Sequence, residues 1–171
     1  MRHRVAKKED LEQLLAIVEE AREYMKEQGF QQWNDTYPRA EHILVDIEKE
    51  ECYVWEEEGV VVGMTSLSFD GESVYDTIEG KWNTEEPYGA LHRFAVSKQA
   101  RGRGIASKLL ALGEQICMEQ GYKGIRVDTH RENKVMQRFL EKHGYIACGI
   151  VYYEEKLGDP SRIAYDKCLH S

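Results

Sequence analysis

Apolar residues near the start of the chain recur at steps of three and four, as they do on one face of an α-helix. Asp10 is expected to cap this helix, with Gln13 in the capping-box position, and Gly29 is expected to end it. A second, shorter helix is predicted over 39–50, where three apolar side chains share a face after Pro38. The residues at these steps in the first helix are Leu11, Leu14, Leu15, Val18, Ala21, Arg22 and Met25.

The next segments carry the apolar clusters of β-strands. Strands are predicted over 52–55 and 60–67, paired antiparallel through a hairpin turn at 56–59. Residues 70–87 show no clear period and form a long connection rich in aromatic residues, among them Tyr75 and Trp82. Two interpretations of these aromatic side chains stay open: they line a binding pocket, or they pin the connection to the domain.

A strand–helix–strand unit follows this connection. Residues 91–96 and 125–130 are predicted strands, and the apolar stripe over 105–120 predicts the helix between them. A crossover of this kind makes the two strands parallel. A further helix is predicted before Gly144, and the final strands over 145–153 and 162–169 are predicted to be joined by a Gly-Asp-Pro turn at 158–160.

Composition indicates one soluble globular domain over residues 1–171. The chain is 42% hydrophobic and 32% charged, and no linker or low-complexity tract divides it. A net charge of -8 disfavours non-specific binding to nucleic acid or anionic membranes. Neither a signal peptide nor a membrane span is recognisable, which predicts a cytoplasmic protein, and the four widely spaced cysteines predict neither a redox motif nor a metal site.

The turn Gln99-Ala-Arg-Gly-Arg-Gly-Ile-Ala106 has the properties of a pyrophosphate-binding site. Glycine lets main-chain N–H groups converge on an anion, the following helix adds its partial positive charge, and the arginines supply full charges. No lysine and hydroxyl follow Gly104, so the turn is not a P-loop, and Ser107 replaces the third glycine of a dinucleotide fingerprint.

With these flanks, the chain resembles the GNAT superfamily of N-acetyltransferases, whose signature is Q/R-x-x-G-x-G/A. Residues 99–104 match this signature, and about sixty consecutive residues have the expected order of elements. The resemblance implies an α/β fold with a central, mostly antiparallel sheet of about six to seven strands and helices on both faces. One parallel pair would splay apart at the cofactor site. It also implies acetyl-CoA as cosubstrate and an amine as acceptor.

The family pattern assigns the cofactor site residue by residue. It implies that backbone groups of Phe94, Ala95 and Val96 hold the pantetheine arm, and that the Ala95 N–H serves the oxyanion. The side chain of Asn133 would contact the arm or cap a helix. The residues that would hold the pyrophosphate are Arg101, Gly102, Arg103, Gly104, Ile105 and Ala106.

A protonated acceptor amine must lose its proton before it attacks the thioester. His92, Asp128 and His130 are the candidate bases because they lie on the two parallel strands. By strand alternation, His92 is expected to share a face with Phe94 and Val96. Tyr53 and Tyr75 are weaker candidates.

The family often has a tyrosine seven residues after the asparagine that corresponds to Asn133, placed to protonate the departing thiolate. Here that position is Leu140, which has no proton to give. Three explanations stay open: another tyrosine (Tyr145, Tyr152 or Tyr153) replaces it, the thiolate leaves to water, or the site is inactive.

The leading prediction is therefore direct acetyl transfer to a primary amine of a small molecule, peptide or protein. The alternatives are a non-catalytic acyl-CoA sensor, which the leucine favours, and a nucleotide-binding interaction domain. Homodimerisation is an expectation from family analogy alone.

Overall fold

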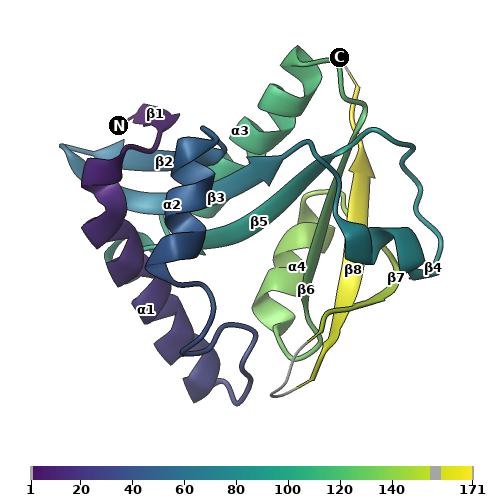
Figure 1. Ribbon diagram of the computed structural model, residues 1–171, viewed down its shortest axis with the longest axis horizontal. Helices are drawn as coiled ribbons and strands as arrows, with labels where there is room; N and C mark the ends of the chain where they lie inside the picture. Colours follow the sequence, from purple (N-terminus) through teal and green to yellow (C-terminus); the bar gives the residue numbers. More distant parts are fainter. Residues whose placement is uncertain (1, 155–158, 171) are drawn as a thin grey trace. The chain divides into compact units, whose positions relative to one another are not determined.

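The computed structural model describes residues 2–154 and 159–170, and its strands join one mixed, mostly antiparallel sheet (Figure 1). The strand order is β1-β2-β3-β5-β6-β8-β7-β4. This confirms the predicted class, and the parallel pair is β5–β6. The described chain has eight strands rather than six to seven, because a strand at residues 2–5 and a two-residue strand at 79–80 were missed.

The helices and strands have the following bounds. The helices are α1 (Leu11–Glu27), α2 (Ala40–Glu48), α3 (Ile105–Glu119) and α4 (Lys134–Lys142). The strands are β1 (Arg2–Val5), β2 (Cys52–Glu57), β3 (Val60–Ser68), β4 (Glu79–Gly80), β5 (Gly89–Val96), β6 (Gly124–His130), β7 (Ile146–Tyr152) and β8 (Ser161–Cys168). The predicted turn at 158–160 begins outside the described residues. Within the described ranges, no helix has the length and apolar character needed to cross a membrane.

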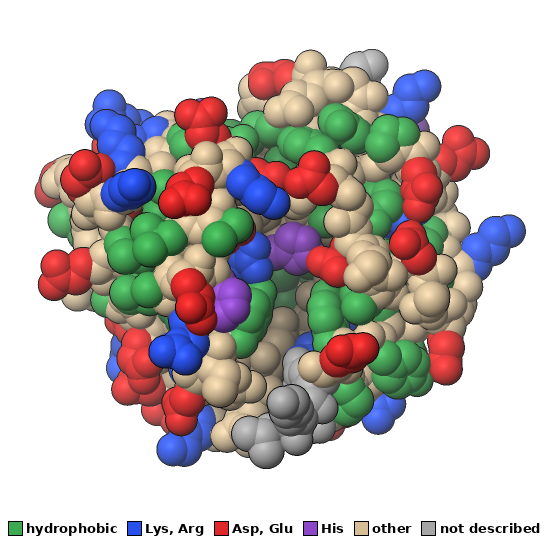
Figure 2. Space-filling model, in the orientation of Figure 1, with side chains coloured by type: hydrophobic (Ala, Val, Ile, Leu, Met, Phe, Trp, Pro, Cys, Tyr) green, Lys and Arg blue, Asp and Glu red, His purple; other side chains and the backbone are tan. Residues whose placement is uncertain are grey.

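The chain divides into two compact units. The first unit comprises 1–27, 33–67 and 91–113, and the second comprises 28–32, 68–90 and 114–171. The prediction of a single domain stays a prediction. Acidic side chains are interspersed with basic and apolar ones over the face displayed in Figure 2, so the negative net charge is not gathered into one patch there.

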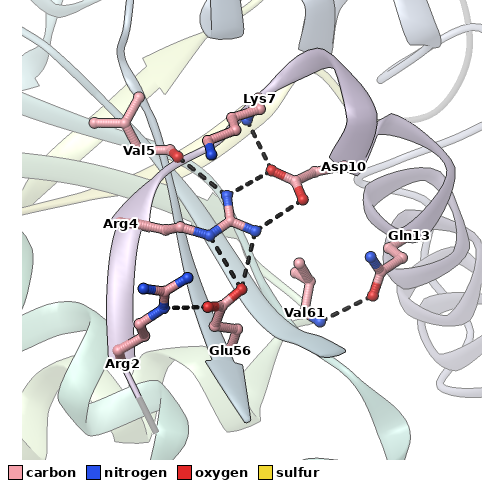
Figure 3. A network of polar contacts seen from close by, with 8 residues as sticks. All are labelled: Arg2, Arg4, Val5, Lys7, Asp10, Gln13, Glu56 and Val61. Atoms are coloured by element: carbon pink, nitrogen blue, oxygen red, sulfur yellow. Dashed lines mark hydrogen bonds and ion pairs between the residues drawn. The ribbon is translucent and has the colours of Figure 1, made fainter. Parts of the chain in front are cut away.

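In the first unit, a polar network fixes β1 to the edge of the sheet (Figure 3). Arg4 donates to both oxygens of the Asp10 carboxylate, at 2.7 and 2.9 Å, and Glu56 accepts from Arg2 and Arg4. Lys7 is the N-cap of the short 3-10 turn over 8–10, and the Asp10 side chain at N3 accepts from the Lys7 N–H at 2.7 Å. The charged side chains of Arg2 and Arg4 thus attach the N-terminal strand to β2 and to the turn before α1.

Two capping expectations for α1 are wrong. Asp10 lies in the 3-10 turn before α1, and the Gln13 side chain does not complete a capping box: its Oε1 accepts from the Val61 N–H at 2.9 Å. A tertiary partner on β3 therefore replaces the local one that the sequence suggested. Gly29 follows α1 with a φ of +86°, which confirms that a glycine ends this segment.

The hairpin between β2 and β3 is tighter than predicted. Glu56 and Glu57 continue β2, and the turn consists of Glu58 and Gly59, with φ values of +49° and +81°. Two consecutive left-handed residues are the geometry of a two-residue hairpin turn. On β3, a Cβ at Gly63 would lie 2.8 Å from Leu109 Cδ1, so this glycine allows α3 to approach the sheet closely.

In the second unit, the long connection is ordered rather than irregular. It contains a 3-10 turn over Ser73–Thr77 and β4, which pairs with β7. Asp166, fully buried on β8, accepts hydrogen bonds from Asn83 and Thr84 of this connection. The Arg126 guanidinium lies 4.4 Å from the Trp82 ring centroid. Buried charge therefore ties the connection to the sheet.

Candidate active site

The turn before α3 has the backbone that anion binding requires. Gly102 and Gly104 have φ values of +80° and +77°, and a Cβ at either position would meet nothing within 4 Å. Residues 101–104 are exposed and α3 begins directly afterwards at Ile105. The Arg101 N–H donates to the Lys98 carbonyl at 3.5 Å, and the exposed residues 102–104 place their main-chain N–H groups at the positive end of a helix.

Both arginines of this turn have partners inside the first unit. Arg103 Nη2 lies 2.7 Å from Glu57 Oε2, and the Arg101 guanidinium lies 5.0 Å from the Tyr24 ring centroid. The carboxylate therefore offsets the charge of Arg103 and competes with any bound phosphate for it. The cation–π contact leaves the charge of Arg101 available.

Strand β5 contains a backbone irregularity that the sequence did not predict. Arg93 has a φ of +48°, an unusual value for a residue with a side chain. A left-handed residue interrupts the alternation of side chains, so the expectation that His92 shares a face with Phe94 and Val96 by simple alternation does not hold. The His92 carbonyl accepts from Thr65 Oγ1 at 3.2 Å.

The side chain of Arg93 is locked in place. It donates to both carboxylate oxygens of Asp46 on α2, at 2.5 and 2.8 Å, and to the phenol oxygen of Tyr37. Asp46 also accepts from Ser66 Oγ at 2.7 Å. These contacts join β5, α2 and the segment between α1 and α2, and they hold the irregular backbone of β5 against the strain of its conformation. No local pattern in the sequence indicates this cluster, since its members are far apart along the chain.

The three residues predicted to hold the cofactor arm lie at the end of β5. Ala95 is buried, whereas Phe94 and Val96 are half-buried and pack against a cluster that includes Ile105 and Leu109 of α3. The end of β5 and the start of α3 are thereby fixed to each other. Contact of these three residues with a cofactor stays a prediction.

In the second unit, Asp128 lies half-buried on β6 and is bound by two phenols. Its Oδ2 accepts from Tyr75 Oη at 2.8 Å and from Tyr153 Oη at 2.6 Å. Tyr75 is completely buried, and this burial raises its pKa well above the usual value. Tyr75 is therefore a permanent hydrogen-bond donor to the carboxylate and a poor base.

His130 is held as a structural residue. Its ring stacks on Phe30, with centroids 5.1 Å apart, and its Nδ1 accepts from the Glu132 N–H at 3.0 Å. Burial lowers its pKa, so the neutral ring is favoured. In a neutral ring with an accepting Nδ1, Nε2 carries the proton, which leaves no ring nitrogen to accept one from an amine. The geometry thus argues against His130 as the base.

The three tyrosines considered for the missing acid have different partners. Tyr145 Oη donates to Glu114 and Tyr152 Oη to Glu79, each at 2.8 Å, whereas Tyr153 binds Asp128. Tyr145 is buried, and Tyr152 is exposed and links β7 to β4. Leu140 is completely buried. Of the three phenols, only that of Tyr153 lies beside a candidate site residue.

Asn133 confirms one of its two predicted roles. Its Oδ1 accepts from the Met136 N–H at 3.1 Å, so it is the N-cap of α4. Contact with a cofactor arm stays a prediction.

Comparisons with known proteins agree with this architecture. The sequence model described as the Acetyltransferase (GNAT) family matches residues 15–145. A GNAT-family acetyltransferase from Streptococcus agalactiae is 33% identical, covers 99% of this chain and 96% of its own, and superposes with a TM-score of 0.88. The PaiA N-acetyltransferase of Thermoplasma acidophilum, solved with coenzyme A, shares the fold at 18% identity, with 98% of each chain covered and a TM-score of 0.72.

A relative of named activity is also similar over nearly the whole chain. The S-(2-succino)cysteine N-acetyltransferase of Bacillus subtilis is 26% identical over an alignment that covers 97% of this chain and 94% of the relative. From its motif, its fold and the extent of the family match, this chain belongs to the GNAT acetyltransferase family.

Proposed function

We propose that this chain is an acetyl-CoA-dependent N-acetyltransferase that moves the acetyl group directly from the thioester to a primary amine. The observation that carries this proposal is the exposed turn with left-handed Gly102 and Gly104 at the start of α3. Its N–H groups suit a pyrophosphate, and its lack of a P-loop lysine disfavours a nucleoside triphosphate. Family membership supports the same chemistry.

The proposed roles of the chain's own residues follow from this assignment. Amides of 101–106 bind the pyrophosphate, and backbone groups of 94–96 hold the pantetheine arm. The Ala95 N–H lies on a strand end fixed by packing, so it would stabilise the oxyanion without reorganising. Asp128 is the best-supported residue for binding the acceptor amine, and His92 remains a candidate base.

The acceptor is proposed to be a small molecule with a primary amino group. The Bacillus relative is named for an acceptor that is an S-substituted cysteine, so a compound of this class is the first acceptor to test. Cytoplasmic location and homodimerisation stay proposals; the four cysteines are free thiols, as in proteins of reducing compartments.

The test is thiol release from acetyl-CoA in the presence of amines. The panel contains S-(2-succino)cysteine, free cysteine, n-butylamine and a short peptide with a free N-terminus. Amine-dependent release with formation of the N-acetyl product supports the enzyme. Tight CoA binding without turnover of any amine supports the sensor instead, for which the buried Leu140 at the usual tyrosine position is the specific observation. Absence of CoA binding refutes both.

A further inference from the structure

One carboxylate in the second unit is held by two phenols and keeps one oxygen open. Both bonds to Asp128, from Tyr75 and Tyr153, reach Oδ2. The two phenols come from separate segments, the 3-10 turn at 73–77 and the residue after β7. Within residues 2–154 and 159–170, no hydrogen bond or ion pair reaches Oδ1 of this half-buried side chain.

The phenols fix the orientation of this carboxylate. Tyr75 is itself anchored, because Trp82 Nε1 donates to its carbonyl at 2.9 Å and the Trp82 ring lies 5.0 Å from its ring. A carboxylate that accepts two phenol protons on one oxygen cannot rotate without losing them. Its second oxygen therefore points in a constant direction.

The negative charge and partial burial of Asp128 favour a positively charged donor at Oδ1. The residue opposite Asp128 on β8 is Ala164, whose side chain is a single methyl group. A half-buried carboxylate oxygen is stabilised more by a charge-assisted hydrogen bond than by a bond from a neutral donor. A primary ammonium group provides such a bond.

We propose that Oδ1 of Asp128 binds the amino group of the acceptor, and that Tyr75 and Tyr153 are positioning residues that aim it. This inference rests on the proposed function and specifies its acceptor as a cationic primary amine. The proton balance of the transfer is conventional: the ammonium nitrogen loses one proton to solvent and one to the departing thiolate. The C–N bond forms first and gives the tetrahedral oxyanion, whose collapse breaks the C–S bond and yields the amide and CoA.

The experiment measures KM and kcat for the best amine of the panel described above and KM for acetyl-CoA, in the wild type and three variants. Asp128→Asn keeps the size of the side chain but removes its charge. Tyr153→Phe removes one phenol bond. Tyr152→Phe is the matched control, because this neighbouring phenol also binds a carboxylate, Glu79, at 2.8 Å, but does not contact Asp128.

Asp128→Asn is expected to raise the acceptor KM about 10- to 100-fold, which corresponds to the loss of one charge-assisted hydrogen bond. Tyr153→Phe should raise it about 3- to 10-fold, since the carboxylate loses one of its two constraints. Neither variant should change the KM for acetyl-CoA, and Tyr152→Phe should change neither constant. A merely structural role would instead lower activity toward both substrates together with thermal stability.

The outcomes separate the two proposals. If the wild type acetylates an amine and folded Asp128→Asn keeps the same acceptor KM, the assignment of the amine site is wrong and the proposed function stands. Equal effects of Tyr153→Phe and Tyr152→Phe overturn the positioning role. If the wild type acetylates no amine, the proposed function itself is refuted.

Discussion

Replacing Gly104 by tryptophan is expected to abolish CoA binding and leave the protein folded. Gly104 is exposed with a φ of +77°, and a Cβ there would meet nothing within 4 Å, so a side chain can leave the backbone without a clash at its first atom. The cost to folding is the left-handed backbone of a residue with a side chain, about 1–2 kcal/mol. For a chain of this size, this cost lowers Tm by about 2–8 °C.

The effect on CoA should be much larger. An indole at this position covers the N–H groups that the proposal assigns to the pyrophosphate. Hydrogen bonds to a charged group contribute about 1.5–3 kcal/mol each, so the loss of two weakens binding by about 100-fold or more.

The assay is calorimetric titration with CoA, combined with thermal unfolding followed by circular dichroism. Gly121→Ala is the matched control, because Gly121 follows the other end of α3 with a φ of +84° and equally open surroundings. It should lower Tm by an amount similar to that for Gly104→Trp, since both variants place a side chain on a left-handed residue, and it should not alter CoA affinity. Unchanged CoA affinity in folded Gly104→Trp would remove this turn from the binding site and refute the reasoning.

Three further predictions concern charge. Glu57→Gln releases Arg103 from its 2.7 Å ion pair and should tighten CoA binding about 2- to 5-fold in low salt. In high salt, calorimetry should show that this gain in affinity vanishes. An unchanged affinity in low salt would contradict the idea that Glu57 and CoA compete for the Arg103 guanidinium. Asp166→Asn should destabilise the protein by about 2–4 kcal/mol in urea unfolding, because the buried carboxylate accepts hydrogen bonds from three neighbouring residues. The hydrogen bond from Arg4 lowers the pKa of Asp10 below its usual 3.8, so the stability that the ionised carboxylate contributes is complete above that pH and is lost as the pH falls through the lower folded pKa. The difference in unfolding free energy between the wild type and Asp10→Asn should therefore shrink in acid. A difference that stays constant with pH would contradict this linkage.

The elements with strong local signals were predictable from the chain alone. The apolar stripes of α1 and α3, the strands around them and the glycines of the turn at 101–104 follow from short-range pattern and backbone geometry, and the structure confirms them. The helix cap at Asn133 also needs only its own neighbours. The turn therefore indicated the family before any tertiary contact was known.

Contacts between distant segments decided the rest. Gln13 bonds to Val61 rather than capping its own helix, and residues 2–5 form a strand because Glu56 and Asp10 hold their arginines. The left-handed backbone of Arg93 depends on Asp46, 47 residues away along the chain. No local sequence pattern encodes such a partner, because the stability of each of these conformations depends on residues that only the folded chain brings into contact.

The same distinction applies to the candidate catalytic groups. The sequence placed Asp128 and His130 on one strand and could not rank them. Tertiary structure separates them: the imidazole is stacked on Phe30 and its Nδ1 already accepts a hydrogen bond, whereas the carboxylate is oriented by two phenols. Within the part of the chain that the structure describes, its second oxygen accepts no hydrogen bond. The sequence determined which chemical groups the chain has, and packing decided which of them is left available, since burial and hydrogen bonding consume the others.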